Sequence, residues 1–383
     1  MNYQRTITLL PPPRIQFGAG CFEQFVVDYL ATGYKKLFVV TLPQMVVQLA
    51  GDLEKLKSAG IKLAINRSVA GEPRFADFEK VLEEARQFGA DSVAGIGGGS
   101  VLDVAKLVAA QLYNTQTTEE VKGIGNLKGR ATYLACVPTT AGTGSEMSPN
   151  AIFLNEQDDK IGVISPYLVP DAAYIDPRLT ITVPRAITAA TGMDALAHCL
   201  EAYTNKWGHP VVDPVALEGV RLISRYLQRA CDNGSDEEAR SAVALGSMYG
   251  GMCLGPVNTT AAHALAYPLG TDYHLAHGLS VSLLLPAVME FNLVAAPQRF
   301  AALAAAMGAT DGGSEEENSR EGVQIIRRLM QDCGLPGSLQ EAGVKAESIP
   351  KMAADAMKVQ RLLKNNIREV TQQDAEAIFR AAF

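Results

Sequence analysis

The chain has 383 residues, of which 48% are hydrophobic and 20% are charged, and its formal net charge is -7 at pH 7. This length exceeds what one compact core usually holds and predicts roughly two domains of a globular protein. The acidic balance, with no basic stripe, argues against nucleic-acid binding, and no apolar run reaches the roughly 18 residues that a membrane span needs.

The amino terminus and the cysteines both indicate a cytoplasmic protein. The opening stretch MNYQRTITLLPPPRIQF lacks the features of a signal peptide. The six cysteines are scattered without a C-x-x-C pair, which is typical of reduced and mostly buried thiols. We therefore expect a cytoplasmic enzyme with a small substrate.

The first half of the chain alternates short β-rich runs with helical stretches. This βαβ alternation predicts a parallel sheet covered by helices. The expected strands are Leu37–Thr41, Ile61–Asn66, Asp91–Ile96 and Thr132–Val137, and the expected helices are Phe22–Ala31, 44–58, Phe75–Phe88 and Val101–Leu112.

A glycine-rich turn follows the third of these strands and leads directly into a helix. Its sequence, Gly95-Ile-Gly-Gly-Gly-Ser100, lets the backbone approach a pyrophosphate closely, and the helix amino terminus offers free N–H groups. We interpret it as a dinucleotide site, although glycine clusters also form plain turns. Asp103, expected in the first helical turn, suits the helix dipole, and Lys106 suits a role in the fold or at the phosphates.

Hydroxyl groups gather after the next strand, in Pro138-Thr-Thr-Ala-Gly-Thr-Gly-Ser-Glu146. Ligands of open α/β sheets bind at the carboxyl ends of the strands, so this loop is a second candidate for cofactor binding. Lys160 follows an Asp-Asp turn, where it could reach a phosphate or ribose or be an exposed loop lysine.

From Pro184 onward the sequence is helical almost throughout, so we place the domain boundary near residue 183, giving domains 1–183 and 184–383. The stretch Thr191–Tyr203 carries Asp194 and His198 four residues apart in an apolar helix, on one face where both could bind a divalent cation. A hydrogen-bonded core pair or a surface pair is the alternative.

Two further histidines lie in segments rich in small and apolar residues, His263 in 260–267 and His277 in 272–278. An unpartnered imidazole would be costly to bury there. One aspartate and three histidines from separate elements make a set of N and O ligands suited to Fe(II) or Zn(II).

Taken together, these motifs resemble those of the iron-containing, group III alcohol dehydrogenase family over essentially the whole chain. The matching stretches are Gly95–Ser100 with Asp103, Pro138–Glu146, Asp176-Pro177 with Leu179-Thr180, Gly192–His198, His263, and His277-Gly278. The resemblance implies a Rossmann-like α/β amino-terminal domain and an all-α carboxy-terminal domain, the architecture also called dehydroquinate synthase-like, with the active site in the cleft between them.

The resemblance also implies roles for individual residues. Asp194, His198, His263 and His277 would be the metal ligands, for Fe(II) or alternatively Zn(II). Gly97, Gly98, Gly99 and Ser100 would bind the pyrophosphate of NAD or NADP, and Thr139, Thr140, Ser145 and Lys160 would line the rest of the cofactor site. The implied reaction is hydride transfer between NAD(P) and a small primary alcohol or aldehyde, including a hydroxy-aldehyde or hydroxy acid. A homodimer is expected.

Two positions depart from the family pattern. Tyr267 stands where many members have a second histidine near the substrate, and a tyrosine, with an unperturbed pKa of about 10, is a poor base near neutral pH. Leu42 stands after the first strand where relatives often have an aspartate that bonds the adenosine ribose and repels a 2′-phosphate. NADP is therefore not excluded.

Two other functional classes remain open from the sequence. One is a metal-independent reductase of the same superfamily, such as the maleylacetate reductases. The other is a non-enzymatic nucleotide- and metal-binding protein, although structural zinc is usually sealed by cysteine-rich ligand sets and this set has no cysteine.

Overall fold

The computed structural model describes residues 4–310 and 312–383, which form two compact units. The α/β unit comprises Leu10–Thr140 and Gly144–Thr180. The helical unit comprises Ile181–Phe383 together with Ala141–Thr143 and a segment that ends at Leu9. The predicted fold class is confirmed. The sequence did not predict that Ala141–Thr143 and the segment ending at Leu9 would group with the helical unit.

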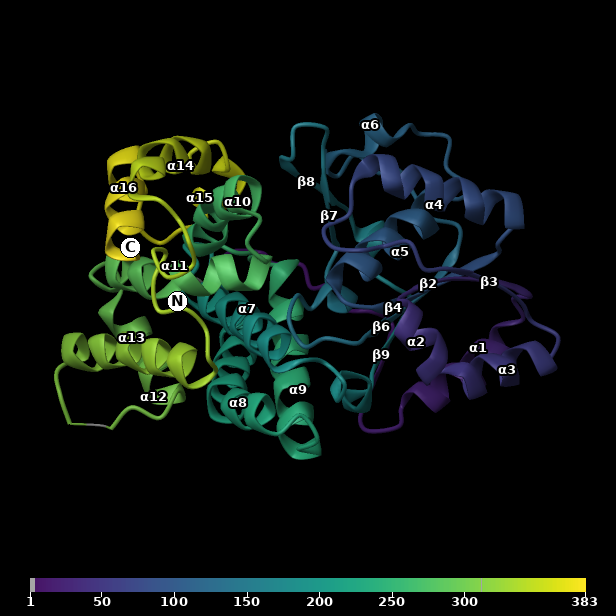
Figure 1. Cartoon of the computed structure of the whole chain (residues 1–383), viewed down its shortest axis with the longest axis horizontal. Helices are drawn as coiled ribbons and strands as arrows, with labels where there is room; N and C mark the ends of the chain where they lie inside the picture. Colours follow the sequence, from purple (N-terminus) through teal and green to yellow (C-terminus); the bar gives the residue numbers. More distant parts are fainter. Residues whose placement is uncertain (1–3, 311) are drawn as a thin grey trace. The chain divides into compact units, whose positions relative to one another are not determined.

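The α/β unit is built on a six-stranded, all-parallel sheet with the order β1-β9-β6-β4-β2-β3 (Figure 1). The strands are β1 (Arg14–Phe17), β2 (Lys36–Thr41), β3 (Lys62–Asn66), β4 (Ser92–Gly97), β6 (Tyr133–Pro138) and β9 (Ala172–Ile175). The central strands are almost wholly buried because helices cover both faces of a parallel sheet.

The period of two along each strand divides the hydrophobic core between the two faces. In β2, Phe38 and Val40 belong to one core cluster and Leu37 and Val39 to the other. Helices α4 (Phe75–Phe88) and α5 (Gly99–Gln111) contribute to the first cluster, and α1 (Phe22–Thr32), α2 (Pro43–Gln48) and α3 (Ala50–Ser58) to the second. Figure 1 shows these two groups of helices on opposite sides of the strands.

The strand order contains a reversal that locates a ligand-binding edge. From β2 the chain continues to the neighbouring edge strand β3, whereas from β4 it continues to β6 on the other side. Ligands of open α/β sheets bind at the carboxyl ends of strands where the order reverses in this way. The loops after β2 and β4 therefore flank the expected cofactor position.

A smaller sheet, ordered β5-β8-β7, lies in the same unit. It pairs β7 (Asn150–Leu154) with β8 (Lys160–Ile164) as an antiparallel hairpin and β8 with the short β5 (Gly123–Ile124). The remaining short elements are α6 (Thr118–Val121), η1 (Ser145–Met147), η2 (Pro166–Leu168) and η3 (Pro177–Thr180).

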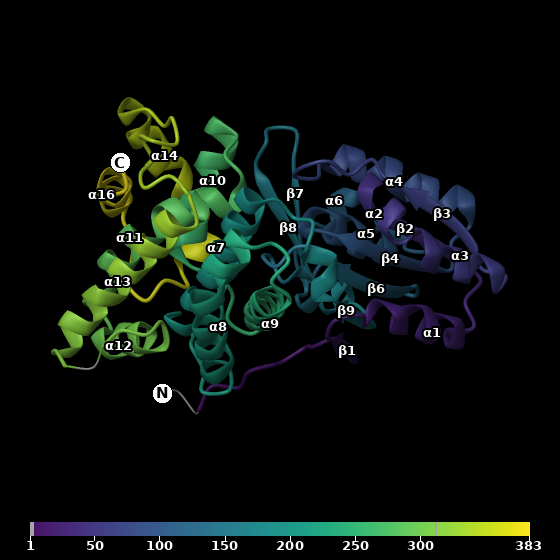
Figure 2. The same cartoon turned by 60° about the horizontal axis from the view of Figure 1, so that its bottom comes forward.

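The helical unit is arranged around α7 (Arg185–Tyr203), which packs against α8, α9 and α11 (Figure 2). From Gly192 to Tyr203 every residue of α7 is buried, so its polar side chains need partners inside the core. The other helices are α8 (Asp213–Asp232), α9 (Glu237–Leu254), α10 (Ala261–Tyr273), α11 (His277–Leu293), α12 (Pro297–Ala306), α13 (Glu315–Asp332), η4 (Ala346–Ser348), α14 (Ile349–Ala356), α15 (Gln360–Leu363) and α16 (Gln372–Ala381). Among the described residues, no helix combines the length and apolarity that a membrane crossing requires.

Two local predictions were wrong, and one of the two alternatives for Lys160 is excluded. The expected helix 44–58 is two helices that meet at Leu49, whose φ of -101° and ψ of 13° interrupt the helical backbone. Helix α5 begins at Gly99 rather than Val101, because the glycines already adopt the geometry of a helix start, and Asp103 therefore lies beyond the first turn. Lys160 is not an exposed loop residue, since it opens β8 with a side chain that is only 7% exposed.

Candidate functional site

The predicted cofactor residues meet at the carboxyl edge of the large sheet. Thr41 pairs with Ile96 and Gly97 with Pro138, so Leu42, the glycine turn and Thr139 follow three adjacent strands at the same edge. The Thr139 N–H donates to the Gly97 carbonyl at 2.9 Å, which holds the two loops together. The structure thus brings these predicted residues together.

Close packing explains one glycine of this turn, Gly97. A Cβ atom at Gly97 would lie 2.6 Å from Cβ of Val101, a distance that side chains cannot tolerate, whereas one at Gly98 would lie 3.4 Å from Oγ1 of Thr140. Gly98 is the N-cap of α5 and no side chain caps this end, so the first-turn N–H groups remain available to an anion. Ser100 belongs to this first turn.

Asp103, Lys106 and Ser145 form a buried network within the α/β unit. The Ser145 hydroxyl donates to Oδ1 of Asp103 at 2.5 Å, the Ile152 N–H donates to Oδ2 at 2.9 Å, and Nζ of Lys106 donates to Oγ of Ser145 at 2.9 Å. Burial raises the pKa of Asp103 and lowers that of Lys106. These bonds fix the loop after β6 onto α5, which is the fold-supporting role considered for Lys106.

Two other predicted cofactor residues have defined surroundings. Nζ of Lys160 forms an ion pair with Glu72 at 2.5 Å. Thr139 and Thr140 remain in the α/β unit, whereas the next three residues, Ala141–Thr143, group with the helical unit. There Gly142 contacts Thr191 of α7 so closely that a Cβ atom would lie 2.8 Å from Cβ of Thr191.

The same buried loop gives a prediction on stability. Burial raises the pKa of Glu146 to about 7, above the ordinary value of 4.5, so the folded protein holds this proton more tightly than the unfolded chain. Stability from this group is fully present below pH 4.5 and is lost as the pH rises to about 7. We expect Glu146→Gln to leave the free energy of unfolding unchanged near pH 4.5 and to raise it by on the order of 3 kcal/mol at pH 8.

Urea denaturation of both proteins at the two pH values measures this difference. An equal effect of Glu146→Gln at both pH values would contradict the raised pKa, because a lost packing contact does not depend on protonation.

The helical unit gathers Asp194, His263 and His277, which come from α7, α10 and α11. One ligand atom from each lies within 4.8 Å of the other two. Nε2 of His263 is 3.4 Å and Nε2 of His277 is 3.7 Å from Oδ1 of Asp194. The side chain of His277 is 28% exposed, against 5% for His263 and 3% for Asp194, so the group opens towards solvent on the side of His277.

His198 lies beside this group without being one of the three. Its ring stacks on that of His263 with centroids 4.6 Å apart. Burial lowers the pKa of His198, although Asp194 opposes this effect. Within the described part of the chain, Nδ1 of His198, Nε2 of His263 and Oδ1 of Asp194 are buried without a hydrogen-bond partner. Such unmet donors and acceptors are costly unless another group binds them.

Glu201 is a residue of this cluster that the sequence did not single out. Its carboxylate accepts hydrogen bonds from Nδ1 of His263 at 2.5 Å and from the Thr260 hydroxyl and the Ala262 N–H at 2.7 Å each. Its position on α7, seven residues after Asp194 and three after His198, was the available signal, because that spacing shares one helix face. A carboxylate behind a ligating histidine fixes the ring and leaves Nε2 to face the metal.

The electrostatics of this cluster favour a cation at its centre. Burial raises the pKa of Asp194, but the three histidines outweigh it and hold this pKa well below its ordinary value. Burial lowers the pKa of His263, but Glu201 and Asp194 outweigh it and raise the value to about 10. One carboxylate and two or three imidazoles with unmet buried atoms fit a borderline divalent ion such as Fe(II) or Zn(II).

The remaining histidines have other surroundings. Both ring nitrogens of His209 are bonded, Nε2 to the Arg5 carbonyl and Nδ1 to the Val211 N–H, each at 3.2 Å. His274 is exposed at the end of α10, with a left-handed φ of 53°. Tyr267, one turn after His263, accepts a hydrogen bond from Arg361 at 2.8 Å.

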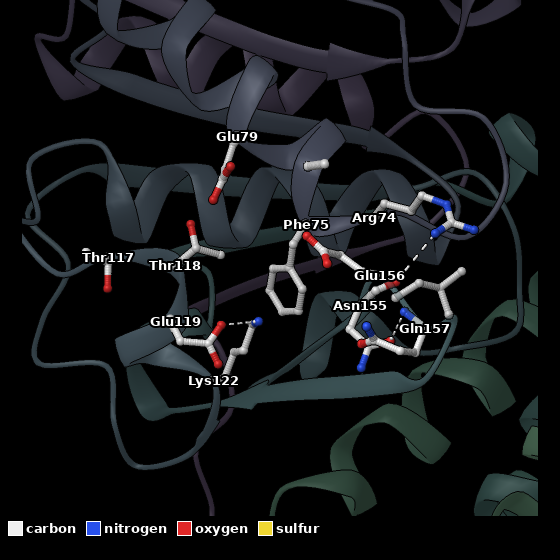
Figure 3. A pocket seen from close by; sticks show the side chains of 12 residues that line it. Arg74, Phe75, Glu79, Thr117, Thr118, Glu119, Lys122, Asn155, Glu156 and Gln157 are labelled. Carbon is white, nitrogen blue, oxygen red and sulfur yellow. Dashed lines mark hydrogen bonds and ion pairs between the residues drawn. The ribbon is translucent and has the colours of Figure 1, made fainter.

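A separate hollow of about 610 Å³ lies on the α/β unit (Figure 3). It is lined by residues from the start of α4, from α6 and from the turn after β7, and none of the predicted site residues contributes. Lys122 lies over the Phe75 ring and pairs with Glu119, while Arg74 pairs with Asp158. Because its two cationic side chains, Arg74 and Lys122, already have internal partners, the hollow is poorly suited to an anionic ligand.

Comparison with known proteins matches both halves of the chain to one family. Residues 12–177 match the family described as iron-containing alcohol dehydrogenase, and residues 188–383 match the carboxy-terminal part of the Fe-containing alcohol dehydrogenase family. Long-chain-alcohol dehydrogenase 1 of Geobacillus thermodenitrificans (strain NG80-2) is 36% identical over 97% of this chain and 95% of its own length. The NAD-dependent methanol dehydrogenase of Bacillus methanolicus is 31% identical over 97% of this chain and 98% of its own length.

Solved structures give the same result. A crystal structure of 1,3-propanediol oxidoreductase covers 99% of this chain and 100% of its own, with a TM-score of 0.95 and 34% sequence identity. The likeness therefore extends over both units.

Proposed function

This chain belongs to the iron-containing alcohol dehydrogenase family, and from that membership we propose how its own residues carry out the reaction. The chain is an NAD(P)-dependent, metal-dependent oxidoreductase that transfers a hydride between the cofactor and a small alcohol or aldehyde. Residues 1–183 serve as the dinucleotide-binding domain and residues 184–383 as the metal-binding domain in this proposal.

One observation supports the metal assignment most strongly. Asp194, His263 and His277 present ligand atoms within 4.8 Å of one another, and two of these residues have buried atoms without hydrogen-bond partners. His198 is the proposed fourth ligand, and Glu201 holds His263 in the orientation that exposes Nε2. A bound Fe(II) or Zn(II) ion would supply Lewis-acid polarisation of the substrate oxygen.

The chain's other residues bind and orient the cofactor. The first-turn amides of α5, with Gly97–Ser100, would hold the pyrophosphate, and Thr139 and Thr140 would contact it from the next loop. Asp103, Ser145 and Lys160 would shape this site through their internal bonds and charge. Tyr267 would orient the substrate by hydrogen bonding rather than accept its proton.

A substrate panel tests the proposed function. The metal-free protein would be assayed for oxidation of NADH and NADPH with short aldehydes, before and after addition of Fe(II) or Zn(II). We expect turnover only with a metal. Equal turnover without metal would favour the metal-independent reductase, and the absence of turnover under every condition would contradict the proposal.

The preference between NAD and NADP depends on Leu42 in this proposal. We expect Leu42→Asp to raise the ratio of kcat/KM with NAD to kcat/KM with NADP at least about tenfold, because a carboxylate there repels the 2′-phosphate. Leu42→Asn is the matched control, since it has the same shape without the charge. An unchanged ratio in Leu42→Asp would place the adenosine ribose elsewhere.

We also propose a cytoplasmic homodimer. The six cysteines, all free and five of them buried, suit a reducing compartment. Sedimentation velocity of the purified protein tests the dimer, which a single monomeric species would contradict.

A further inference from the structure

Arg361 contacts Tyr267 of α10, the helix that also carries His263. Its Nη2 atom donates a hydrogen bond to the Tyr267 hydroxyl at 2.8 Å, and its side chain is half-buried. The helix that carries it, α15, packs against α10. The hydrogen bond therefore holds the guanidinium group of Arg361 against α10, the helix that also carries His263.

Tyr267 and His263 share one face of α10. They are four residues apart, which places their Cβ atoms about 6 Å from each other on the helix surface. His263 directs its free Nε2 atom towards Asp194 and His277. A molecule bound at the metal ligands and extended along this face of α10 would therefore approach the Tyr267 hydroxyl and its arginine.

The carboxylates of α10 and α14 already pair with lysines. Asp272 of α10 pairs with Lys351 at 2.6 Å, and Asp355 of α14 pairs with Lys351 at 3.0 Å and Lys358 at 2.6 Å. In the part of the chain that the structure describes, no carboxylate lies within ion-pair distance of Arg361. The guanidinium fork binds carboxylates and related oxyanions with two parallel bonds, and only one bond of this guanidinium within the described chain, to Tyr267, is seen.

We propose that Arg361 binds a terminal anionic group, a carboxylate or sulfonate, at the end of the substrate opposite its reacting carbon. This inference rests on the proposed function and names its substrate class, the short ω-hydroxy acids and the corresponding aldehydes. The ω-hydroxy acid loses a hydride from its carbinol carbon to NAD(P)⁺ and a proton from its hydroxyl group, which yields the ω-oxo acid, NAD(P)H and H⁺. Tyr267 is a positioning residue that fixes the guanidinium group.

Calorimetric titration of the metal-loaded protein with propane-1-sulfonate tests the binding step, because this anion cannot be oxidised as an alcohol. We expect the Kd to rise at least about tenfold in Arg361→Gln and to stay within about twofold in Lys364→Gln, which removes an equal charge from an exposed position three residues away. Equal affinity in the parent and in Arg361→Gln would place the anion at the metal ligands and overturn the proposal.

A kinetic comparison tests the substrate class. With 3-hydroxypropanoate and its uncharged carboxamide, the parent should favour the acid in kcat/KM, and Arg361→Gln should reduce that preference at least about tenfold, mainly through KM. Arg361→Lys, which keeps the charge but not the fork, should fall between the two. A preference that survives in Arg361→Gln would contradict the inference. Absence of turnover with both compounds would count against the proposed function, and the titration would still decide the role of Arg361.

Discussion

His263→Ala is expected to abolish metal binding and to lower turnover at least about 1,000-fold while leaving the affinity for NADH largely intact. The substitution removes the imidazole whose Nε2 faces Asp194 and His277. Loss of the metal removes Lewis-acid stabilisation worth several kcal/mol. Metal content after dialysis, turnover with an aldehyde and fluorescence titration with NADH would be measured on the same preparation.

A stability measurement and a control variant complete this experiment. Glu201 loses its imidazole partner in the variant but keeps its bonds from Thr260 and Ala262, so a measurable loss of stability should accompany the loss of metal. His274→Asn is the matched control, because it alters an exposed histidine at the end of the same helix and asparagine tolerates the left-handed backbone there. A His263→Ala protein that retained full turnover after metal removal would contradict the ligand assignment.

Gly98→Val should raise the Kd for NADH at least about 100-fold without preventing folding. A Cβ atom at this position meets Thr140 at a tolerable 3.4 Å, but the two added methyl groups would occupy the space above the first-turn amides of α5. A pyrophosphate could then no longer approach those N–H groups closely. The same change at Gly97 would be a poorer test, because the 2.6 Å contact with Val101 would disturb the fold itself.

Gly129→Val serves as the control for the loss of a glycine in the α/β unit, since a Cβ atom there meets nothing within 4 Å. Fluorescence titration measures the affinity, and metal analysis should show an unchanged metal content in both variants, because the ligands all lie in the helical unit. If Gly98→Val bound NADH as tightly as the parent, the assignment of the glycine turn to the pyrophosphate would be wrong.

The sequence alone determined the features that depend on neighbouring residues. Continuous apolar runs such as 37–40 predict buried parallel strands, and the change to a helical period predicts the covering helices. The glycine turn predicted a direct passage from β4 into α5, and the four-residue spacing of Asp194 and His198 placed both on one face of a buried helix. Specific motifs also carried the family resemblance.

The tertiary structure decided everything that depends on residues far apart in the chain. The strand order, and with it the position where the order reverses, follows from sheet pairings that no local pattern records. The grouping of Asp194 with His263 and His277, some 70 to 80 positions later, depends on how α7, α10 and α11 pack.

The roles of the supporting residues also depend on contacts between distant parts of the chain. Glu201 had a helical spacing that could have drawn notice, but its role follows from the contact with His263, 62 residues away. The role proposed for Arg361 depends on its hydrogen bond to Tyr267, 94 residues earlier in the chain. Sequence patterns report the periodicity of single elements, whereas a site is made by the packing of several elements, and the free energy that selects one packing is shared among many side chains.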